Sequence, residues 1–463
     1  MKMTIFEKVL EIYQKIENSE FTICLHCLGR MFSLLGTNTS NLERGYSLLL
    51  SFTMENHRKY LSTDKELKDE SISNLKILAK NANFSPAQKV LGNEGFDSAK
   101  TLDNKLCLLC ENIFLNLDPY IEKAKQITKD FEFNNFLVGT SPASKIINNE
   151  DKFKSELSLL NSESFKSHFN REVGKKLSLI LNKPVEFNNP EIVFVYSISF
   201  NEFDIDLIIK SLFISGRYNK LMRGIPQTHW DCKNCSGRGC KICNFTGRQY
   251  QTSVEQLVNP EFHRSTQSSD SKFHGAGRED IDVRMLGTGR PFIIELKNPK
   301  RRAVDLKKIE KSVNKTNRGK IKISDLKFSN KNEVIKLKSE AENSKKVYKA
   351  LVETKHKINK KKFGEMLEKL KIHLEHKKIS QRTPNRVSHR RADLVRKKTI
   401  HNIEGNYLKP YLFKCLIETQ GGTYIKELIS GDGGRTTPSF SSILGFETIC
   451  NELDVLEIKH RIM

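Results

Sequence analysis

A glycine- and arginine-rich loop, GAGREDIDVRMLGTGRPF at residues 275–292, contains the side chains best suited to chemistry. Asp280 and Asp282 are short carboxylates in an electropositive setting. The arginines around them are Arg278, Arg284 and Arg290. Neighbouring cations keep a carboxylate ionised, as a nucleophile or a general base must be, and arginines present planar forks that match phosphate. On composition alone, the loop fits equally well a charged hairpin that is closed by internal salt bridges.

The stretches around this loop indicate how it would be held. The run PFIIELKN directly after it is apolar and β-branched and predicts a strand, so the reactive group would lie on a loop braced by a sheet. Strand-like and helical runs alternate from residue 253 onward, and residues 360–378 predict a basic amphipathic helix. A helix is also predicted to begin at Thr423, after a glycine turn. Near the N-terminus, residues 4–18 and 41–52 predict two further helices.

Three segments, in chain order, resemble a known enzyme family. The Arg-Glu-Asp at 278–280 is similar to motif II of pseudouridine synthases, an Arg-x-Asp loop that carries the catalytic aspartate. The longer string GREDIDVRMLGTGRPF resembles the archaeal family of tRNA pseudouridine synthases that act on uridines 54 and 55 of the TΨC arm. KKVYKA at 345–350 is similar to the K-x-Y-x-A segment of that family, and GGTYIK at 421–426 to its motif III. Three ordered motifs are far more specific than any one of them.

The resemblance implies an α+β protein with two domains. Residues 251–463 would form a pseudouridine synthase catalytic domain with a mixed antiparallel sheet, and residues 1–250 an accessory RNA-binding domain with zinc and a THUMP-like module. Residues 215–230, SGRYNKLMRGIPQTHW, fall in the accessory part; their cations and aromatic rings suit phosphates and stacked bases, although chance clustering explains the composition as well.

The resemblance also assigns roles to single residues. Asp280 would be the catalytic carboxylate, Lys426 would pair with it, and Tyr348 would stack on the extruded base. Asp282 competes with Asp280, and only the Arg-x-Asp spacing favours Asp280. Further contacts to the RNA are expected from Arg278, Arg284, Arg382, Arg386 and Leu444. Because the isomerisation exchanges a C–N bond for a C–C bond within one nucleotide, no organic cofactor is expected. The choice between attack by Asp280 and removal of a ribose proton stays open, as does the choice between positions 54, 55 or both.

Eight of the ten cysteines have metal-ligand spacing. CKNCSGRGCKIC at 232–243 places four thiolates within twelve residues, with glycines to turn the chain, which is a strong metal signal. Disulfides are the main alternative there, and a reducing cytosol disfavours them. The pairs at 24/27 and 107/110 lie about 80 residues apart, so zinc competes there with redox pairs or buried thiols, and the resemblance favours zinc. The predicted structural zinc ligands are Cys24, Cys27, Cys107, Cys110, Cys232, Cys235, Cys240 and Cys243. Cys415 and Cys450 are expected in the core.

The net charge of +23 is local. Residues 297–398 contain 34 lysines and arginines against 11 aspartates and glutamates, an excess of 23 that equals the charge of the whole chain. Such a segment favours a polyanionic partner, here tRNA. No apolar run approaches the roughly 20 residues that span a bilayer, so a cytoplasmic protein without membrane contact is expected. The sequence leaves the oligomeric state open, and a monomer is the expectation.

A second function fits the same features without catalysis. In a zinc-containing RNA-binding or RNA-chaperone protein, the metal modules and the basic segment would do all the work, and Asp280 would be structural. Conversion of uridine by the protein alone, without an added cofactor, distinguishes the two functions.

Overall fold

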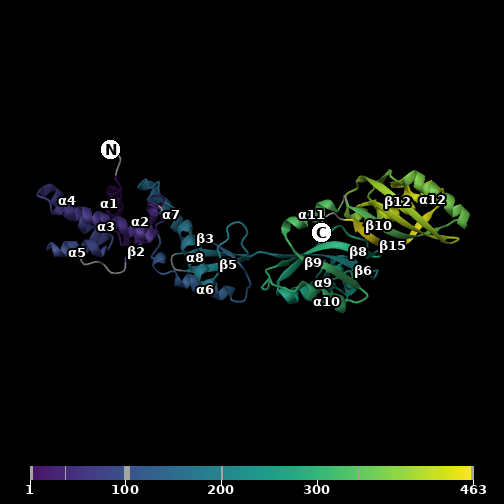
Figure 1. The fold of residues 1–463 in the computed structure, drawn as a ribbon, viewed down its shortest axis with the longest axis horizontal. Coiled ribbons are helices and arrows are strands. Elements are labelled where there is room, and N and C mark those ends of the chain that lie inside the picture. Colours follow the sequence, from purple (N-terminus) through teal and green to yellow (C-terminus); the bar gives the residue numbers. More distant parts are fainter. Residues whose placement is uncertain (1–3, 37, 98–104, 200–201, 342–343, 460–463) are drawn as a thin grey trace. The chain divides into compact units, whose positions relative to one another are not determined.

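The computed structural model describes residues 4–36, 38–97, 105–199, 202–341 and 344–459. The chain forms two compact units, Met1–Ile209 and Lys210–Met463. In Figure 1 the first unit is purple to teal and the second is teal to yellow. This division differs from the predicted boundary at residue 250. Strand β6 (Leu212–Lys220) pairs with β8 (Arg284–Lys297) inside the sheet of the second unit, so residues 210–250 belong to the same unit as the three motif segments.

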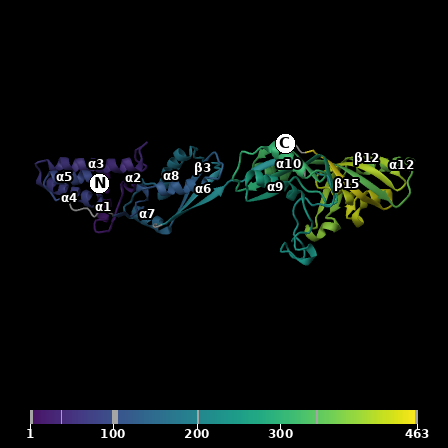
Figure 2. The ribbon, with the colours of Figure 1, turned by 90° about the horizontal axis from the view of Figure 1, so that it is seen from below.

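The first unit begins with a group of helices. Capping boxes formed by Thr4 with Glu7 and by Ser40 with Glu43 start two of them, which confirms the two predicted N-terminal helices. Figure 2 shows α3, α4 and α5 side by side, and they pack against each other. A short parallel pair, β1 (Phe21–Thr22) with β2 (Leu106–Cys107), joins the two ends of this region. The helices are α1 (Ile5–Lys15), α2 (Leu25–Met31), α3 (Asn41–Tyr60), α4 (Lys65–Asn81) and α5 (Ser85–Asn93).

A small α/β layer completes the first unit. Its sheet has the order β3-β4-β5, with β3 parallel and β5 antiparallel to β4. The strand β4 alternates buried and less buried residues, because one face of the sheet packs on the core, and α8 packs against the neighbouring β3. The elements are the short turn η1 (Ile113–Leu115), α6 (Asp118–Thr128), β3 (Phe136–Pro142), α7 (Ser144–Glu156), α8 (Phe165–Leu181), β4 (Ile192–Ile198) and β5 (Phe203–Ile209).

The second unit is built on one large sheet. Its order is β14-β11-β12-β13-β10-β15-β8-β6-β9, with β7 added beside β8. Among the described strands of this unit, β15 and β8 pair in parallel and the other neighbours are antiparallel, which confirms the predicted mixed sheet and the α+β class. The remaining strands are β7 (Asp270–Gly275), β9 (Ile321–Ser329), β10 (Lys345–Thr354), β11 (Lys378–Arg382), β12 (Val395–Lys409), β13 (Leu412–Gln420), β14 (Thr436–Thr437) and β15 (Thr448–Lys459).

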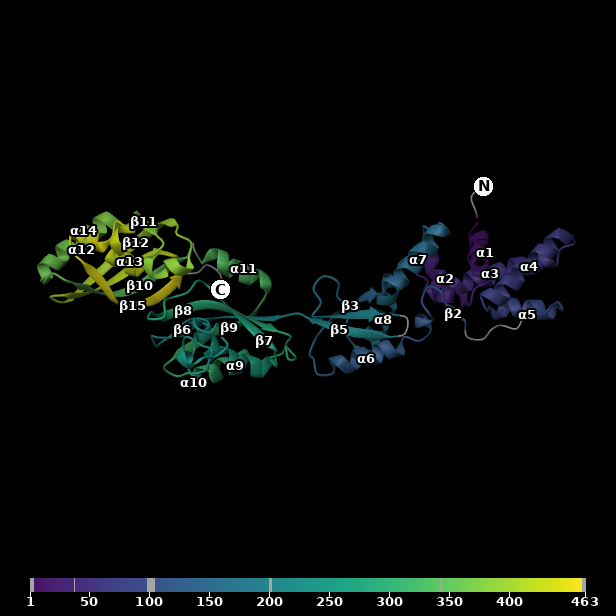
Figure 3. The ribbon, with the colours of Figure 1, turned by 180° about the vertical axis from the view of Figure 1, so that it is seen from behind.

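Helices cover this sheet in two groups. Near β9, α9 packs against α10, and near β12, α12 packs against the sheet and α14 (Figure 3). The predicted basic helix at 360–378 is α12, which ends at Leu374 and buries four apolar residues along one side. Cys415 is buried in this core and Cys450 packs against it, as predicted. The helices and short turns are η2 (Lys241–Cys243), α9 (Val254–Thr266), α10 (Leu306–Thr316), α11 (Lys331–Glu340), α12 (Lys360–Leu374), η3 (Asn385–Arg390), α13 (Ile425–Ser430), η4 (Asp432–Gly434) and α14 (Phe440–Leu444). No described helix is long and apolar enough to cross a membrane.

Candidate active site and metal centres

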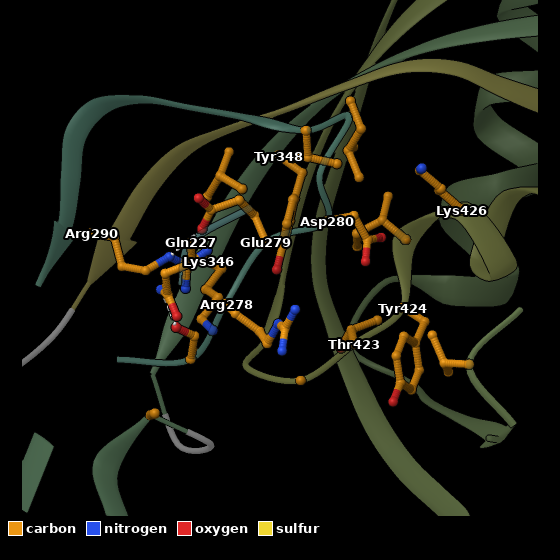
Figure 4. A pocket seen from close by; sticks show the side chains of 18 of the residues that line it. Gln227, Arg278, Glu279, Asp280, Arg290, Lys346, Tyr348, Thr423, Tyr424 and Lys426 are labelled. Atoms are coloured by element: carbon orange, nitrogen blue, oxygen red, sulfur yellow. Dashed lines mark hydrogen bonds and ion pairs between the residues drawn. The ribbon is translucent and has the colours of Figure 1, made fainter. Parts of the chain in front are cut away.

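A cavity of about 460 Å³ lies in the second unit, where the three segments singled out from the sequence meet. Asp280 comes from the loop between β7 and β8, Tyr348 from β10, and Lys426 from the first turn of α13. Figure 4 shows Asp280 between Tyr348 and Lys426. The helix begins at Ile425, two residues later than predicted, because the turn extends through Tyr424. The cavity is large enough for one nucleotide and has cations at several points of its wall.

The cation that holds Asp280 is Arg386, and this corrects the predicted pairing with Lys426. An Arg386 Nη1 lies 2.9 Å from Asp280 Oδ2. The same guanidinium donates from Nε to Glu427 Oε1 at 2.6 Å, so it bridges the loop and α13. Burial alone would lower the pKa of Arg386, but Glu427 and Asp280 outweigh it and raise that pKa, so the bridge stays charged. The motif II loop is therefore tied to the motif III helix through η3.

Lys426 instead pairs with Asp282. Its Nζ lies 2.6 Å from Asp282 Oδ2, and the Asp282 side chain is 65% exposed. Partial burial acts to raise the pKa of Asp282, but the hydrogen bond and the charge of Lys426 lower it below the usual value. The two carboxylates thus have different cations: Asp280 has Arg386 within the cavity wall, and Asp282 has Lys426 nearer to solvent.

A buried polar layer supports the loop from behind. Glu279 accepts hydrogen bonds from the Tyr218 hydroxyl at 2.9 Å and from Arg290 Nε at 2.8 Å. Lys220 Nζ donates to the backbone oxygens of Asp280 and Ile281 at 3.0 and 3.2 Å. Tyr218, Lys220 and Arg290 are buried, so they are internal supports rather than the RNA-contacting or phosphate-binding groups that their sequence context indicated. Burial raises the pKa of Tyr218 far above its usual value, which keeps the hydroxyl a donor.

The other predicted RNA contacts lie in different settings. Arg284 donates to Asp454 through Nε and an Nη2, both at 2.9 Å. The guanidinium carbon of Arg278 lies 5.1 Å from the centre of the Trp230 ring. Both side chains line a second cavity that Asp280 and Asp282 also line. Arg382 is exposed on β11 and pairs with Asp393 at 2.6 Å. Leu444 packs against the core at the end of α14 and is outside the lining of the cavity.

Several residues of the site were not assigned a role from the sequence. Lys346 lines the cavity two residues before Tyr348 on β10, and strand periodicity alone would have placed it on the same face. Gln227 and Glu427 reach the site only because β6 and α13 fold against the loop, so no local pattern identifies them. Tyr424 accepts a hydrogen bond from Arg391 at 2.9 Å. It lies inside the motif III string, so the sequence alone could have identified it as a residue of the site.

Both predicted cysteine sets come together, one in each unit. In each set the four sulfur atoms all lie within 4.8 Å of one another. Sulfur separations such as 3.6 Å for Cys24–Cys110 and 3.8 Å for Cys235–Cys243 are close to the roughly 3.8 Å edge of a tetrahedron built on Zn–S bonds of about 2.3 Å. They are far longer than a disulfide bond. The donor sets therefore fit a tetrahedral metal ion.

The second set lies in a turn-rich module of the second unit, whereas the sequence placed it in the accessory domain. Backbone N–H groups of Gly239 and Gly247 donate to Cys235 and Cys243 sulfurs at 3.2 and 3.3 Å, as thiolates require. A Cβ on Gly247, where φ is +69°, would lie 2.3 Å from a backbone oxygen of this turn, so only glycine fits. The module directly follows Trp230, and the backbone of Gln249 on its other side donates to the Trp230 carbonyl oxygen. It therefore fixes the ring that stacks on Arg278.

The comparisons with known proteins agree with this arrangement. Residues 213–459 match the family model described as Pus10, C-terminal, and residues 120–197 match the Pus10 THUMP domain, archaeal. The tRNA pseudouridine synthase Pus10 of Methanothermobacter marburgensis is 43% identical over 445 residues, which cover 96% of each chain. The protein of that name from Methanocaldococcus jannaschii is 40% identical over 95% of this chain and 92% of its own. The one from Methanothrix thermoacetophila is 39% identical over 94% and 91%.

The family model starts at β6, as the second structural unit does, and covers more than half of the chain. The archaeal THUMP match covers α6 to β4, the small α/β layer of the first unit. The resemblance seen in the sequence is thereby confirmed: the chain belongs to the Pus10 family of tRNA pseudouridine synthases.

Proposed function

We propose that this chain isomerises uridine 54, uridine 55 or both in the TΨC arm of tRNA to pseudouridine, with Asp280 as the reactive carboxylate. The observation that carries the proposal is the convergence of Asp280, Tyr348 and Lys426 on one nucleotide-sized cavity. The relatives are named for action on tRNA, which supports the substrate class. A non-catalytic RNA-binding protein would not need an aspartate clamped by an arginine inside such a cavity.

The reaction breaks the N1–C1′ bond, forms a C5–C1′ bond, and moves one proton from C5 to solvent while N1 takes up another. Atoms and electrons balance without an oxidant, a reductant or an energy source. The target base has to leave the RNA stack to reach the cavity. Asp280 would act at the sugar, Arg386 would fix its carboxylate, and the Tyr348 ring would support the base. Burial raises the pKa of Tyr348 to about 12, so its hydroxyl stays protonated and can donate a hydrogen bond.

The surface around the cavity suits a polyanion. The basic residues 297–398 include Arg386 in η3, Arg391 directly after η3, and the exposed Arg382 on β11. Arg278, which stacks on the Trp230 ring, and Arg382 are proposed to bind phosphates of the TΨC arm. Lys426 is proposed to neutralise negative charge beside the flipped nucleotide. Arg284 and Leu444 are assigned supporting parts, because Asp454 already holds Arg284 and the core holds Leu444.

Four transcripts of one tRNA test the position: both uridines present, either one replaced by cytidine, or both replaced. With protein alone, we expect pseudouridine in the first three or in those that retain one particular position, and none in the fourth, as read by chemical mapping. Pseudouridine elsewhere in the double replacement would contradict the assignment to the TΨC arm. Tight binding of all four transcripts with no conversion would favour the RNA-binding protein instead.

We further propose that both cysteine sets hold structural zinc. The donor chemistry of four thiolates and the tetrahedral sulfur spacing support zinc over harder cations. Zinc would supply folding energy in these modules and no reaction step.

Metal analysis of the purified chain is therefore expected to find about two zinc ions per molecule. Cys235→Ser should lower this by about one, because three thiolates hold zinc poorly, and should weaken tRNA binding through the displaced Trp230. Cys415→Ser is the matched control, because Cys415 is a buried cysteine outside both sets. A metal content near zero in protein prepared without chelator would contradict the proposal.

A further inference from the structure

Lys346 is a buried cation for which the catalytic scheme above has no role. Its side chain projects from β10 into the cavity and is only 6% exposed. Among the described residues, none forms a hydrogen bond or an ion pair with its ammonium group. A buried charge without a partner is costly, and native proteins retain one where a ligand completes it.

The groups around Lys346 leave positive charge uncompensated. Arg290 is next to it, since a Cβ placed on Gly277 would lie 3.4 Å from both Arg290 Nη1 and Lys346 Nζ. Glu279 is the carboxylate of this layer, and it is bonded to Arg290 and Tyr218 and faces Lys220 at 3.8 Å. Three buried cations therefore share one buried carboxylate. The Lys346 ammonium group faces the cavity, so a hydrogen-bond acceptor of a bound ligand could reach it there.

Gln227 lies at the same end of the cavity as Lys346 and presents a hydrogen-bond acceptor where Lys346 presents a donor (Figure 4). Its Nε2 donates to the Tyr218 hydroxyl at 2.8 Å and to the Gly277 carbonyl oxygen at 2.9 Å, which uses both amide hydrogens. The amide orientation is thereby fixed, and no described group donates to its Oε1. Lys346 thus presents a donor from strand β10, and Gln227 presents an acceptor from the loop after β6, where its two hydrogen bonds hold it.

Asp280, Tyr348, Lys346 and Gln227 all line the same cavity. In Figure 4, Tyr348 stands between Asp280 and the Lys346–Gln227 pair. A base whose sugar is at Asp280 and whose ring lies against Tyr348 extends toward that pair. The atoms of uracil farthest from the sugar are O4, an acceptor, and N3–H, a donor.

We propose that Lys346 and Gln227 read the target base: the Lys346 ammonium donates to uracil O4, and Gln227 Oε1 accepts from N3–H. The proposal rests on the proposed function and names how that site selects its substrate. Cytosine has an amino donor in place of O4 and a lone pair in place of N3–H. Its amino group would therefore face the Lys346 donor, and its N3 lone pair would face the Gln227 acceptor. Sites built on buried polar groups reject such mismatches strongly, because the protein groups are left unpaired.

The contact with O4 is tested by combining a substitution at Lys346 with a single-atom change in the substrate base and comparing the separate and joint effects. The substrate is whichever tRNA uridine the wild-type chain converts, with uridine, 4-thiouridine or 2-thiouridine at that position; sulfur is a weaker acceptor than oxygen. For the wild-type chain we expect 4-thiouridine to lower kcat/KM by roughly ten- to a hundredfold, the usual size for a bond to a charged group. In Lys346→Met, uridine itself should fall by about that factor, and the difference between uridine and 4-thiouridine should disappear.

The 2-thiouridine arm is the matched control, because its effect should be the same in both proteins. Lys346→Met is expected to fold, since it removes an unpaired buried charge and keeps an unbranched side chain that is only one atom shorter; its thermal unfolding checks this. An equal 4-thiouridine effect in the wild-type chain and Lys346→Met would overturn the proposal. Absence of any conversion by the wild-type chain would instead overturn the proposed function.

The pH profile gives a second measurement. Burial lowers the pKa of Lys346 to about 7, with Arg290 and Lys398 adding to the shift and Glu279 opposing it. Only the protonated form donates, so kcat/KM of the free enzyme should fall as pH rises through about 7. Lys346→Arg, which stays charged, should move this decline to higher pH. A rate that rises with pH through the same range in the wild-type chain and not in Lys346→Met would show Lys346 acting as a base, and would overturn the proposal.

Discussion

Asp280→Asn is expected to abolish pseudouridine formation, by at least about a thousandfold, while the protein still folds and binds tRNA. An amide is neither a nucleophile nor a base of useful strength, so every role open to Asp280 at the ribose is lost. The fold should survive because the side chain is partly exposed and Arg386 retains its bonds to Glu427. Affinity for tRNA should stay constant or rise slightly, because a negative charge beside the phosphates is gone.

Asp282→Asn is the matched control. It removes the same charge two residues away, from a side chain that is mostly exposed and pairs with Lys426 near solvent. Exposed pairs contribute little to stability, so this variant should keep activity within about tenfold. Both variants are compared under single-turnover conditions, by tritium release from tRNA labelled at C5 of uridine. Activity in Asp280→Asn together with its loss in Asp282→Asn would reverse the two roles, and activity in both would contradict the synthase assignment of this loop.

The family resemblance selected the segments with Tyr348 and Lys426. Composition singled out the loop with Asp280, a carboxylate among arginines, and fitted a charged hairpin equally well. The cation that the resemblance assigned to Asp280, Lys426, is wrong. Lys426 and Arg386 both come within reach of the loop, and the choice depends on how α13 and η3 dock, so Glu427 decides it by fixing Arg386.

The same limit applies to the buried charges. In the string GRYNKLMRGIPQ, Lys220 and Tyr218 have the composition of an RNA-binding surface, yet both are internal. Their partners, Glu279 and the carbonyl oxygens of the loop, lie about 60 residues later in the chain. A local pattern cannot distinguish a cation that faces RNA from one that supports a loop, and the misplaced boundary at residue 250 has the same origin.

The cysteine sets show the contrast between local and distant information. The spacing at 232–243 alone predicted one set, because all four ligands belong to one turn-rich segment. The set at 24, 27, 107 and 110 needed the parallel pairing of β1 with β2, which sets Phe21 opposite Leu106 and so joins the two pairs across the chain. Only the family resemblance favoured that outcome beforehand.

Arg386→Gln is expected to lower turnover by about a hundredfold and to destabilise the catalytic unit as well. Without the guanidinium, Asp280 loses the group that orients it, and displacement of a catalytic group by about 1 Å can cost that factor. The buried Glu427 is left without its cation, and an unpaired buried charge is strongly unfavourable. Lys426→Gln, which removes a cation of the same cavity that pairs with Asp282, is the control and should have the smaller effect on both quantities.

The double variant Arg386→Gln/Glu427→Gln separates the two effects. Removing the carboxylate relieves the unpaired charge, so thermal unfolding should return toward that of the wild-type chain. Asp280 still lacks its clamp, so single-turnover conversion should stay low. If conversion recovers together with stability, Arg386 acts only through folding, and the orientation of Asp280 depends on other groups. If stability recovers alone, the bridge from Asp280 through Arg386 to Glu427 is the means by which the motif III helix controls the reactive carboxylate.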